Sequence, residues 1–422
     1  MRLVYLTTGT GSFYCGSCMR DNALVLALRK RGHDALLVPM YLPLTLDEVS
    51  AAENIPVFYG GINSYLQQVS PLFRHTPRWL DKLLDSPKAL ASAGKRAGMT
   101  KASELGPMTL SMLKGEEGNQ KKELERLVEW LASEKPDWVV LSNALLLGMG
   151  RRIREATGAK IACTLQGEDG FLDALGAPFN TKCWELVGER GAEFDALIPV
   201  SHYHSELMQR RAKLPPEKLH VVYNGIDLTG YVPRAEPPET LTLGYLARMY
   251  EPKGLGTLIE AFLLLAPRLP QLKLAVAGAQ VGYDHFYVGK LVAKLAAAGL
   301  ADRVSWHPNV SRDEKIAFLK NLTVLSVPAT YGESFGLYVI EALAAGVPVV
   351  QPKHGGFPEI LAQTGGGALY EPLTPEALAH ALETLLSDPK AAFELGAVGQ
   401  KAVFEKFSVD AMAEGVEKVL TS

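Results

Sequence analysis

The run Glu333-Ser-Phe-Gly-Leu-Tyr-Val-Ile-Glu341 carries two glutamates eight positions apart and decides the expected fold of the second half of the chain. Upstream, residues 322–328 are apolar and β-branched, which predicts a buried parallel strand. Downstream, residues 337–345 have a helical pattern that ends at Gly346, and residues 347–350 predict the next strand. The glutamates therefore lie where a strand passes into a helix, at the carboxyl edge of an open sheet. Doubly wound folds bind ligands at that edge.

The residues between the two glutamates are suited to bind an anion. The backbone amides of Phe335, Gly336 and Leu337 lie at the expected helix start, where N–H groups have no partner within the helix. Glu333 is expected in the loop and Glu341 just over one turn into the helix, so that both can face one cleft. Carboxylates accept hydrogen bonds from sugar hydroxyls, and the helix start can hold a phosphate, so the pattern indicates a sugar nucleotide. A single glutamate here would more often be a solvated helix-end carboxylate.

The wider pattern resembles the signature of the retaining glycosyltransferases of family 4. The residues that carry the resemblance are Pro328, Glu333, Phe335–Leu337, Glu341–Leu343, Gly346–Val350, His354–Ile360, Gly244–Arg248, Lys253, Gly254 and Val221–Asp227. The resemblance covers nearly all of the chain from about Asp195 onward, where its motifs are specific, and it is patchy before that residue.

Strands and helices are expected to alternate in both halves of the chain, which is typical of parallel βαβ units. A proline-rich segment at residues 231–239 interrupts the alternation and indicates a linker. The family resemblance implies the GT-B architecture, in which two Rossmann-like doubly wound domains face a deep cleft. We expect an acceptor-side domain at 1–228 and a nucleotide-sugar-binding domain at 229–404. The C-terminal helix, at about 405–422, is expected to pack back on the first domain.

The resemblance also implies roles for individual residues. Arg248 ends an expected strand and Lys253 follows in a short loop, where two cations can neutralise a departing diphosphate in place of a metal ion. Glu333 is implied to bind hydroxyls of the transferred sugar, Glu341 the nucleotide ribose, and the pair Gly355-Gly356 to add backbone donors or to serve only the turn. The expected catalytic residues are Arg248, Lys253 and Glu333, and the expected donor-binding residues are Gly16, Phe335, Gly336, Leu337, Glu341, Gly355 and Gly356. Since no Asp-x-Asp motif stands at a strand end, we expect neither a metal nor a cofactor beside the nucleotide-sugar substrate.

The first half of the chain departs from the family pattern at two places. The family has a glycine pair after the first strand, whereas here Gly16 matches the second glycine and Cys15 replaces the first. The family often has a histidine after the strand at 160–165, where this chain has Gln166 on the acceptor side. Glutamine forms hydrogen bonds but does not titrate, which argues against a general base here. It fits a front-face mechanism in which the leaving phosphate takes the acceptor proton, and assistance from Glu168-Asp169 is the alternative.

The four cysteines allow a second hypothesis. Cys15 and Cys18 lie at an expected helix start, where thiolates are stabilised, and this indicates redox activity when it is taken alone. A zinc or iron–sulfur site that also uses Cys163 and Cys183 is conceivable. However, Cys163 lies within an expected strand and Cys163 and Cys183 have no close pair spacing, so that small core residues are the favoured interpretation.

Composition limits the class of protein. The chain has 422 residues, 47% of them apolar, which is enough to bury two cores, and its 43 basic and 46 acidic residues give no general attraction to nucleic acid. Few cysteines, no signal peptide and no bilayer-length apolar segment predict a cytoplasmic protein. Residues 65–112 mix apolar and basic side chains, which favours an acceptor-binding insertion, with peripheral membrane contact as the alternative.

The sequence therefore predicts a retaining, metal-independent glycosyltransferase that takes a sugar from a nucleotide sugar. UDP is a family-level expectation, and the acceptor is an unknown hydroxyl on a glycan, a lipid or a small molecule. The alternatives are a nucleotide-sugar-binding protein without turnover and an epimerase of the same fold. A phosphorylase would need a pyridoxal-binding lysine site, and no stretch of the sequence resembles one.

Overall fold

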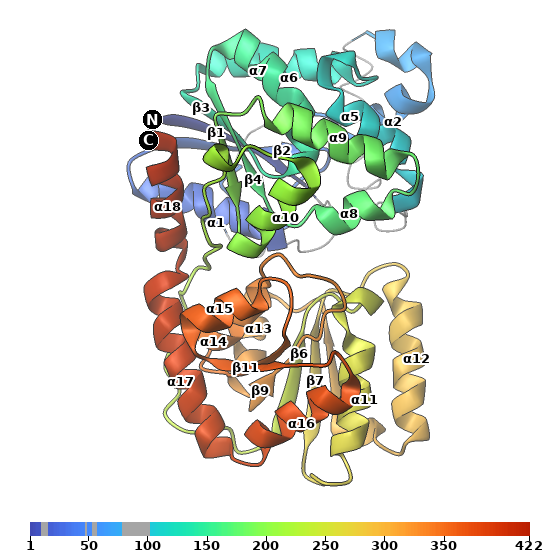
Figure 1. The fold of residues 1–422 in the computed structure, drawn as a ribbon, viewed down its shortest axis with the longest axis vertical. Coiled ribbons are helices and arrows are strands. Elements are labelled where there is room, and N and C mark those ends of the chain that lie inside the picture. Colours follow the sequence, from blue (N-terminus) through green and yellow to red (C-terminus); the bar gives the residue numbers. More distant parts are fainter. Residues whose placement is uncertain (10–15, 47–48, 53–56, 78–101) are drawn as a thin grey trace. The chain divides into compact units, whose positions relative to one another are not determined.

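The computed structural model describes residues 1–9, 16–46, 49–52, 57–77 and 102–422. The chain divides into two compact units, one formed by Met1–Tyr223 with Met412–Ser422 and the other by Asn224–Ala411. Each unit is a parallel sheet covered by helices (Figure 1). The expected fold class, two doubly wound α/β domains, is confirmed.

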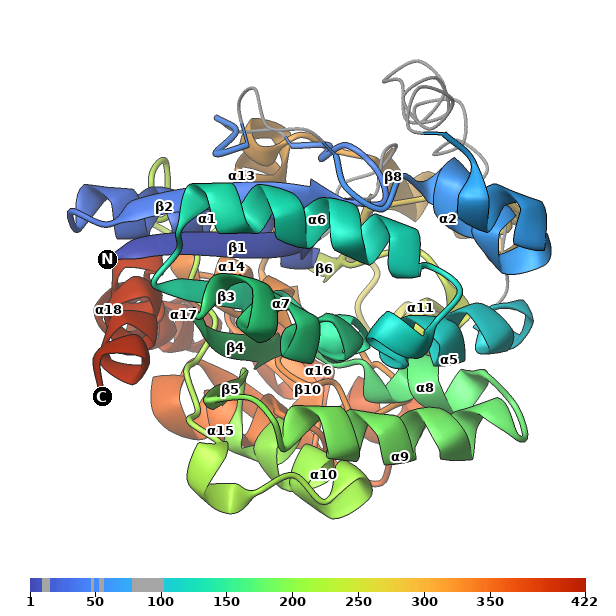
Figure 2. The ribbon, with the colours of Figure 1, turned by 90° about the horizontal axis from the view of Figure 1, so that it is seen from above.

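The first unit is built on a five-stranded sheet in the order β2-β1-β3-β4-β5, and all neighbouring strands are parallel. The strands are β1 (Arg2–Thr8), β2 (Asp34–Met40), β3 (Trp138–Leu141), β4 (Lys160–Leu165) and β5 (Ala196–Pro199). Figure 2 shows them in this order, with α6 (Lys121–Glu134) and α7 (Gly150–Thr157) running over the sheet. From β1 the chain passes first to β2 on one side, and then back across β1 to β3, β4 and β5 on the other side. With right-handed crossovers, this change of direction places helices on both faces of the sheet. The strands are accordingly apolar and almost wholly buried.

The second unit has a six-stranded parallel sheet in the order β11-β10-β9-β6-β7-β8. The strands are β6 (Thr242–Leu246), β7 (Lys273–Gly278), β8 (Val304–Pro308), β9 (Val324–Leu325), β10 (Val349–Pro352) and β11 (Gly367–Tyr370). The strand expected at 322–328 is thus shorter, and the strand β11 was not foreseen. The shortening has a local cause, since the Val327 N–H donates to the side chain of Gln351 instead of a neighbouring strand and Pro328 has no N–H to donate.

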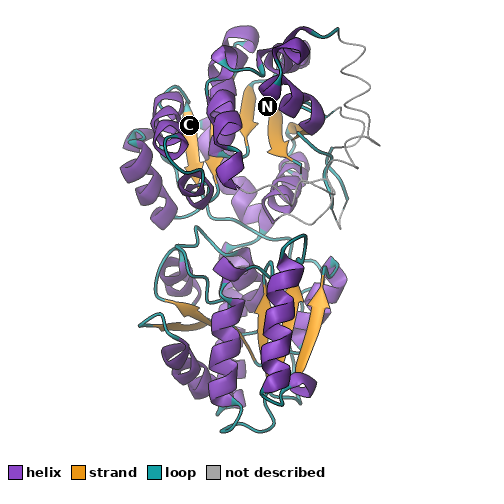
Figure 3. Cartoon of the chain, turned by 90° about the vertical axis from the view of Figure 1, so that its right-hand side faces the viewer, coloured by secondary structure: helices purple, strands orange, loops and turns teal. Residues whose placement is uncertain are grey.

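Helices surround the sheet of each unit (Figure 3). Apart from the C-terminal helix, the other helices among the described residues of the first unit are α1 (Gly16–Lys30), α2 (Gly61–Val69), α5 (Gly106–Leu113), α8 (Asp169–Ala174), α9 (Phe179–Gly191) and α10 (His202–Ala212). Those of the second unit are α11 (Leu255–Leu265), α12 (Asp284–Ala297), α13 (Arg312–Lys320), α14 (Leu337–Ala344), α15 (Phe357–Thr364), α16 (Pro375–Leu386) and α17 (Pro389–Lys406). The short 3-10 turns are η1 (Pro71–His75), η2 (Ala102–Glu104), η3 (Gly115–Glu117), η4 (Ala144–Met149), η5 (Pro216–Lys218), η6 (Glu251–Lys253) and η7 (Ala301–Arg303). None of the described helices is both long and apolar enough to cross a membrane.

The proline-rich segment at 231–239 belongs to the second unit, whereas the sequence indicated a linker there. Side chains hold the segment in place: Arg234 Nη1 donates to the Leu322 carbonyl oxygen at 2.8 Å, and Gln400 Nε2 donates to the Val232 carbonyl oxygen at 3.4 Å. The boundary instead falls between Tyr223 and Asn224, a few residues before the expected position at 228. Local proline content therefore did not mark the boundary between the units.

The C-terminal helix α18 (Val409–Thr421) returns the chain to the first unit, with Met412 as the first residue assigned there. The expected segment began earlier, at about 405, but a bridge between Ile226 and Ser408 keeps that part of the chain with the second unit. In the first unit, Glu417 binds Arg31 and lies 3.1 Å from His33 Nε2. These contacts fix the last helix against the end of α1 and the start of β2.

Candidate functional site

Three neighbouring strands of the second unit end at one edge of its sheet, and the residues expected to bind a donor follow them. Arg248 and Lys253 come after β6, Glu333 follows β9, and Gly355 follows β10. Because β10, β9 and β6 are adjacent and parallel, their carboxyl ends lie side by side. This is the edge at which doubly wound folds bind ligands.

Glu333 is held by three donors that all reach the same oxygen. Its Oε2 accepts hydrogen bonds from Lys253 Nζ, from the Tyr331 hydroxyl at 3.3 Å and from the Tyr338 hydroxyl at 3.1 Å. Within the described residues, no hydrogen bond reaches Oε1. The carboxylate is therefore fixed through one oxygen, and the other is available to accept from a ligand hydroxyl.

Lys253 lies among aromatic rings as well as beside Glu333. Its Nζ is 5.2 Å from the ring centres of both Tyr331 and Tyr338, which are cation–π distances. Burial, and secondarily the charge of Glu333, raises the pKa of both tyrosines, so that they remain neutral donors. The backbone of Lys253 is set by Gly254, whose φ of +75° and approach to the Pro328 carbonyl oxygen leave no room for a side chain.

Arg248 is oriented by a buried acid from a different element. Its Nε and Nη2 donate to the two oxygens of Asp284 at 2.9 and 3.2 Å, which is a bidentate pair. The Asp284 side chain is 5% exposed, whereas that of Arg248 is 37% exposed. Arg248 also lies over the Tyr250 ring, at 5.0 Å from its centre. Within the described residues its Nη1 makes no hydrogen bond, so the guanidinium is held by one side and can present the other to an anion.

The pair Gly355-Gly356 allows two loops to touch. The Gly356 N–H donates to the Glu333 carbonyl oxygen at 2.7 Å. A Cβ at Gly355 would lie 2.7 Å from both the N and the O of Glu333, and its φ is +62°. The pair thus holds the backbone of Glu333, and the Gly356 N–H is engaged within the protein. Of the two roles weighed for these glycines, the geometry favours the loop contact over direct donation to a ligand.

The helix start between the two glutamates forms as the sequence indicated. Gly336 has a φ of +87° and precedes α14, so the chain turns sharply there into the helix. The Phe335 side chain is buried, 6.1 Å from the Phe407 ring, and so belongs to the core. Glu341, in α14, accepts from Lys315 Nζ at 2.6 Å. Glu341 therefore pairs with a cation of its own, separate from the Lys253–Glu333 pair.

In the first unit, Gln166 follows β4, and its side chain has several polar contacts. Its Nε2 donates to the Ser142 carbonyl oxygen at 2.8 Å and lies 3.3 Å from Asp21 Oδ1. Asp21 is fully buried and accepts from the Thr7 hydroxyl at 2.7 Å and from Arg20 at 3.0 Å. The amide of Gln166 thus contacts two distant parts of the chain, the loop after β3 and helix α1.

The cysteines do not form a cluster in the described residues. Cys18, Cys163 and Cys183 are buried, and burial raises the pKa of Cys163 and raises that of Cys183 to about 11. Among the described side chains, no three His, Cys, Asp or Glu residues come together as metal ligands would. Cys15 lies outside the described residues, so the proposed thiol pair with Cys18 is not visible.

The predicted residues fall into separate groups. Lys253 and Glu333 are in contact, and the Gly356 N–H donates to the backbone carbonyl of Glu333. Glu341 pairs with Lys315 and Arg248 with Asp284, while Gly16 and Gln166 belong to the other unit. Four partners were not predicted: Tyr331, Tyr338, Lys315 and Asp284. The tyrosines lie close to Glu333 in sequence and could have been suspected, whereas Lys315 and Asp284 come from distant helices and left no local signal.

Two parallel α/β units, the second with a charged site at its carboxyl edge, define the GT-B class of fold. Solved structures agree: Anabaena HepE in complex with UDP and glucose matches with a TM-score of 0.72 at 18% identity, over 100% of both chains. Sucrose-phosphate synthase from Thermosynechococcus elongatus matches with a TM-score of 0.72 at 19% identity, over 100% of this chain and 98% of that one.

The family models identify the chain more closely. Residues 107–229 match the model described as Glycosyltransferase Family 4, and residues 232–402 match the model described as Glycosyl transferases group 1. The chain belongs to the group 1 glycosyltransferases of family 4 type, as its resemblance to that family predicted.

Curated relatives share part of the chain. A D-inositol 3-phosphate glycosyltransferase of Mycobacterium sp. (strain KMS) is 31% identical over 230 residues, which cover 52% of this chain and 51% of the relative. An alpha-maltose-1-phosphate synthase of Mycolicibacterium smegmatis (strain ATCC 700084 / mc(2)155) is 30% identical over 263 residues, covering 57% and 66%. The chain spans about half the length of the first curated relatives that it matches.

Proposed function

We propose that this protein is a retaining glycosyltransferase that moves a sugar from a nucleotide diphosphate sugar, with UDP as the nucleotide, to a hydroxyl acceptor. The observation that carries the proposal is the contact of Lys253 with Glu333 at the carboxyl edge of the second sheet, beside the start of α14. A cation, a carboxylate with one open oxygen and a helix start match a phosphate joined to a sugar. The complexes of HepE with UDP and with UDP-glucose support this choice of donor.

The roles of the residues follow from their contacts. Lys253 and Arg248 would neutralise the diphosphate, each through the face that its protein partner leaves open. Glu333 would accept a hydrogen bond from a hydroxyl of the transferred sugar at Oε1. Glu341, which pairs with Lys315, would bind the ribose. Gln166 would bind substrate on the acceptor side through hydrogen bonds and not as a base.

The proposed reaction is a substitution on one face of the sugar. The bond from the anomeric carbon to the β-phosphate oxygen breaks, and its electron pair stays with the phosphate. The acceptor oxygen forms the new bond on the same face, and its proton passes to the departing phosphate oxygen. Arg248 and Lys253 would stabilise the negative charge that develops on this oxygen as the bond breaks, and the nucleoside diphosphate then leaves with the proton.

A panel of nucleotide sugars tests the proposal. The donors are offered with acceptors that include inositol phosphates, sugar phosphates and a lipid fraction, and released nucleotide and glycoside product are both measured. The phosphorylated acceptors are suggested by the names of the relatives, and lipids by the exposed Tyr65, Val69 and Leu72 within the segment 65–112. Nucleotide and glycoside should appear together. Donor binding without release would favour a binding protein, and an epimerised donor would favour an epimerase.

We expect transfer to be independent of divalent metals, because Arg248 and Lys253 supply the positive charge that such an ion would bring. Transfer is measured before and after treatment with excess chelator, and again after adding back magnesium or manganese. The rates should agree within about twofold. Loss of transfer on chelation, with recovery on adding a metal, would contradict the proposed charge neutralisation.

A further inference from the structure

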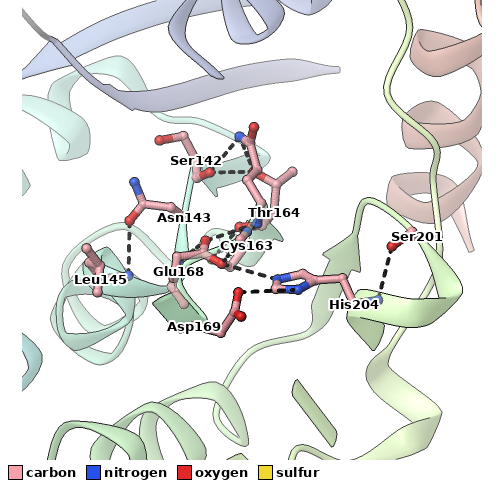
Figure 4. A network of polar contacts seen from close by, with 12 residues as sticks. Ser142, Asn143, Leu145, Cys163, Thr164, Glu168, Asp169, Ser201 and His204 are labelled. Carbon is pink, nitrogen blue, oxygen red and sulfur yellow. Dashed lines mark hydrogen bonds and ion pairs between the residues drawn. The ribbon is translucent and has the colours of Figure 1, made fainter. Parts of the chain in front are cut away.

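A buried glutamate, Glu168, has polar contacts with residues that follow three strands of the first unit (Figure 4). Its Oε1 accepts from the Ala144 N–H at 2.9 Å and lies 3.1 Å from the Gln166 N–H. Its Oε2 accepts from the N–H groups of Gln166 and Gly167, both at 3.0 Å. Ala144 follows β3 and Gln166 follows β4, so one carboxylate joins two neighbouring loops.

The third strand end contributes His204, near the start of α10 after β5. Its Nε2 lies 3.4 Å from Glu168 Oε2, and its backbone N–H donates to the Ser201 hydroxyl at 3.0 Å. The His204 side chain is fully buried, so its position is set by the packing around it.

Glu168 remains charged in this network. Burial alone would raise its pKa, but the contact with His204 and the N–H groups that donate to it outweigh burial, and the pKa is lowered. A charged carboxylate accepts several hydrogen bonds at once and makes each of them stronger than a neutral group would. Gly167, with a φ of +117°, gives the turn the tight shape that brings both N–H groups to one side.

We propose that Glu168 is the positioning residue of the acceptor-side turn: it fixes the backbone of Gln166 and Gly167 so that the Gln166 amide meets the substrate in one orientation. This inference rests on the proposed function for its effect on catalysis. The Gln166 side chain is held at its other end by Ser142 and Asp21, so that the turn is fixed from both sides. Glu168 acts through Gln166 and touches no reacting atom.

The neighbouring acid supplies a matched control. Asp169 is next in sequence, and its Oδ1 lies 4.0 Å from His204 Nδ1. Within the described residues, Asp169 makes no hydrogen bond to the backbone of Gln166 or Gly167. Glu168 and Asp169 thus both lie near His204, but only Glu168 accepts hydrogen bonds from the backbone of the turn.

A double-mutant cycle between Glu168→Gln and Gln166→Ala tests the inference. In Glu168→Gln, an NH2 group replaces one acceptor oxygen and faces N–H groups, so kcat should fall about tenfold while the KM for the donor stays within about twofold. In the Gln166→Ala background the same change should lower kcat by less than about twofold, because the residue that Glu168 positions is already absent. Asp169→Asn should stay within about twofold of wild type.

An equal fold-loss in both backgrounds would overturn the inference and leave Glu168 a merely structural residue. If Glu168→Gln does not fold, Glu168→Asp takes its place in the cycle, since it keeps the charge and shortens the reach. A second readout needs no activity: the backbone amide signals of Gln166 and Gly167 in NMR spectra should shift and lose hydrogen-exchange protection in Glu168→Gln but not in Asp169→Asn. Unchanged amides would also overturn it, whereas an inactive wild type with the expected amide changes would count against the proposed function alone.

Discussion

Replacing Glu333 with alanine is expected to lower kcat about a hundredfold while leaving the second unit folded. The carboxylate lies at a sheet edge and is held by Lys253 and two tyrosine hydroxyls, so that its loss should remove the proposed contact with the sugar and leave the apolar core unchanged. A charged hydrogen bond that strengthens in the transition state is worth on the order of 3 kcal/mol, which corresponds to this change in rate. The measurement is the steady-state rate of transfer, with circular dichroism to verify folding.

The control for Glu333→Ala is Glu371→Ala. Glu371 also pairs with a lysine of the same unit, Lys353 at 2.5 Å, but both side chains are more than half exposed. The rate of this variant should stay within about twofold of wild type, since exposed ion pairs contribute little. Glu333→Gln should be impaired nearly as much as Glu333→Ala. The glutamine amide has only one acceptor oxygen, so its NH2 group must face either Lys253 or the sugar, where the carboxylate offers an acceptor to both. Near-normal transfer in folded Glu333→Ala would remove Glu333 from the donor site.

Arg248→Ala is expected to have a comparable effect, a loss of about a hundredfold in kcat. The guanidinium would stabilise the diphosphate as the glycosidic bond breaks, and Asp284 holds it in place for that task. The same substitution leaves Asp284 buried without its cation, so that the unfolding temperature should fall as well. Transfer rates and thermal unfolding are measured on the same preparation.

A second change separates these two effects of Arg248→Ala. In Arg248→Ala/Asp284→Asn the buried position is neutral, so stability should recover in part while kcat stays low. Arg268→Ala is the matched control, because Arg268 also pairs with a carboxylate, Glu383, but its side chain is half exposed. If kcat recovers together with stability in the double variant, Arg248 is a structural residue and the diphosphate must be neutralised elsewhere.

The sequence predicted the part of the site that depends on local patterns. The strand, the turn at Gly336 and the helix after it follow from hydrophobic periodicity and from a glycine that adopts a positive φ. The stop at Gly346 has the same cause, with a φ of +71°. Lys253 and Glu333 come from two different strand ends, and their contact could be expected because adjacent parallel strands end at the same edge.

What the sequence could not predict depends on side chains that meet only in the folded chain. Asp284 comes from the start of α12 and Lys315 from α13, and neither is marked by spacing or motif. Glu168 was considered only as an alternative catalytic group, whereas it contacts His204 and backbone N–H groups of its own turn and of the loop after β3. Hydrogen bonds to backbone depend on the exact path of a loop, which periodicity does not encode.

The anomeric configuration of the product distinguishes a same-face reaction from an inverting one. The wild-type protein is incubated with an α-linked nucleotide sugar and the acceptor found in the panel, and the new glycoside is followed by proton NMR from the earliest time point. The coupling constant of the anomeric proton then reports the configuration before any rearrangement. A same-face reaction gives an α-linked glycoside that appears together with the released nucleoside diphosphate. A β-linked product would contradict the same-face reaction, and nucleotide sugar that binds without ever giving a glycoside would contradict glycosyl transfer itself.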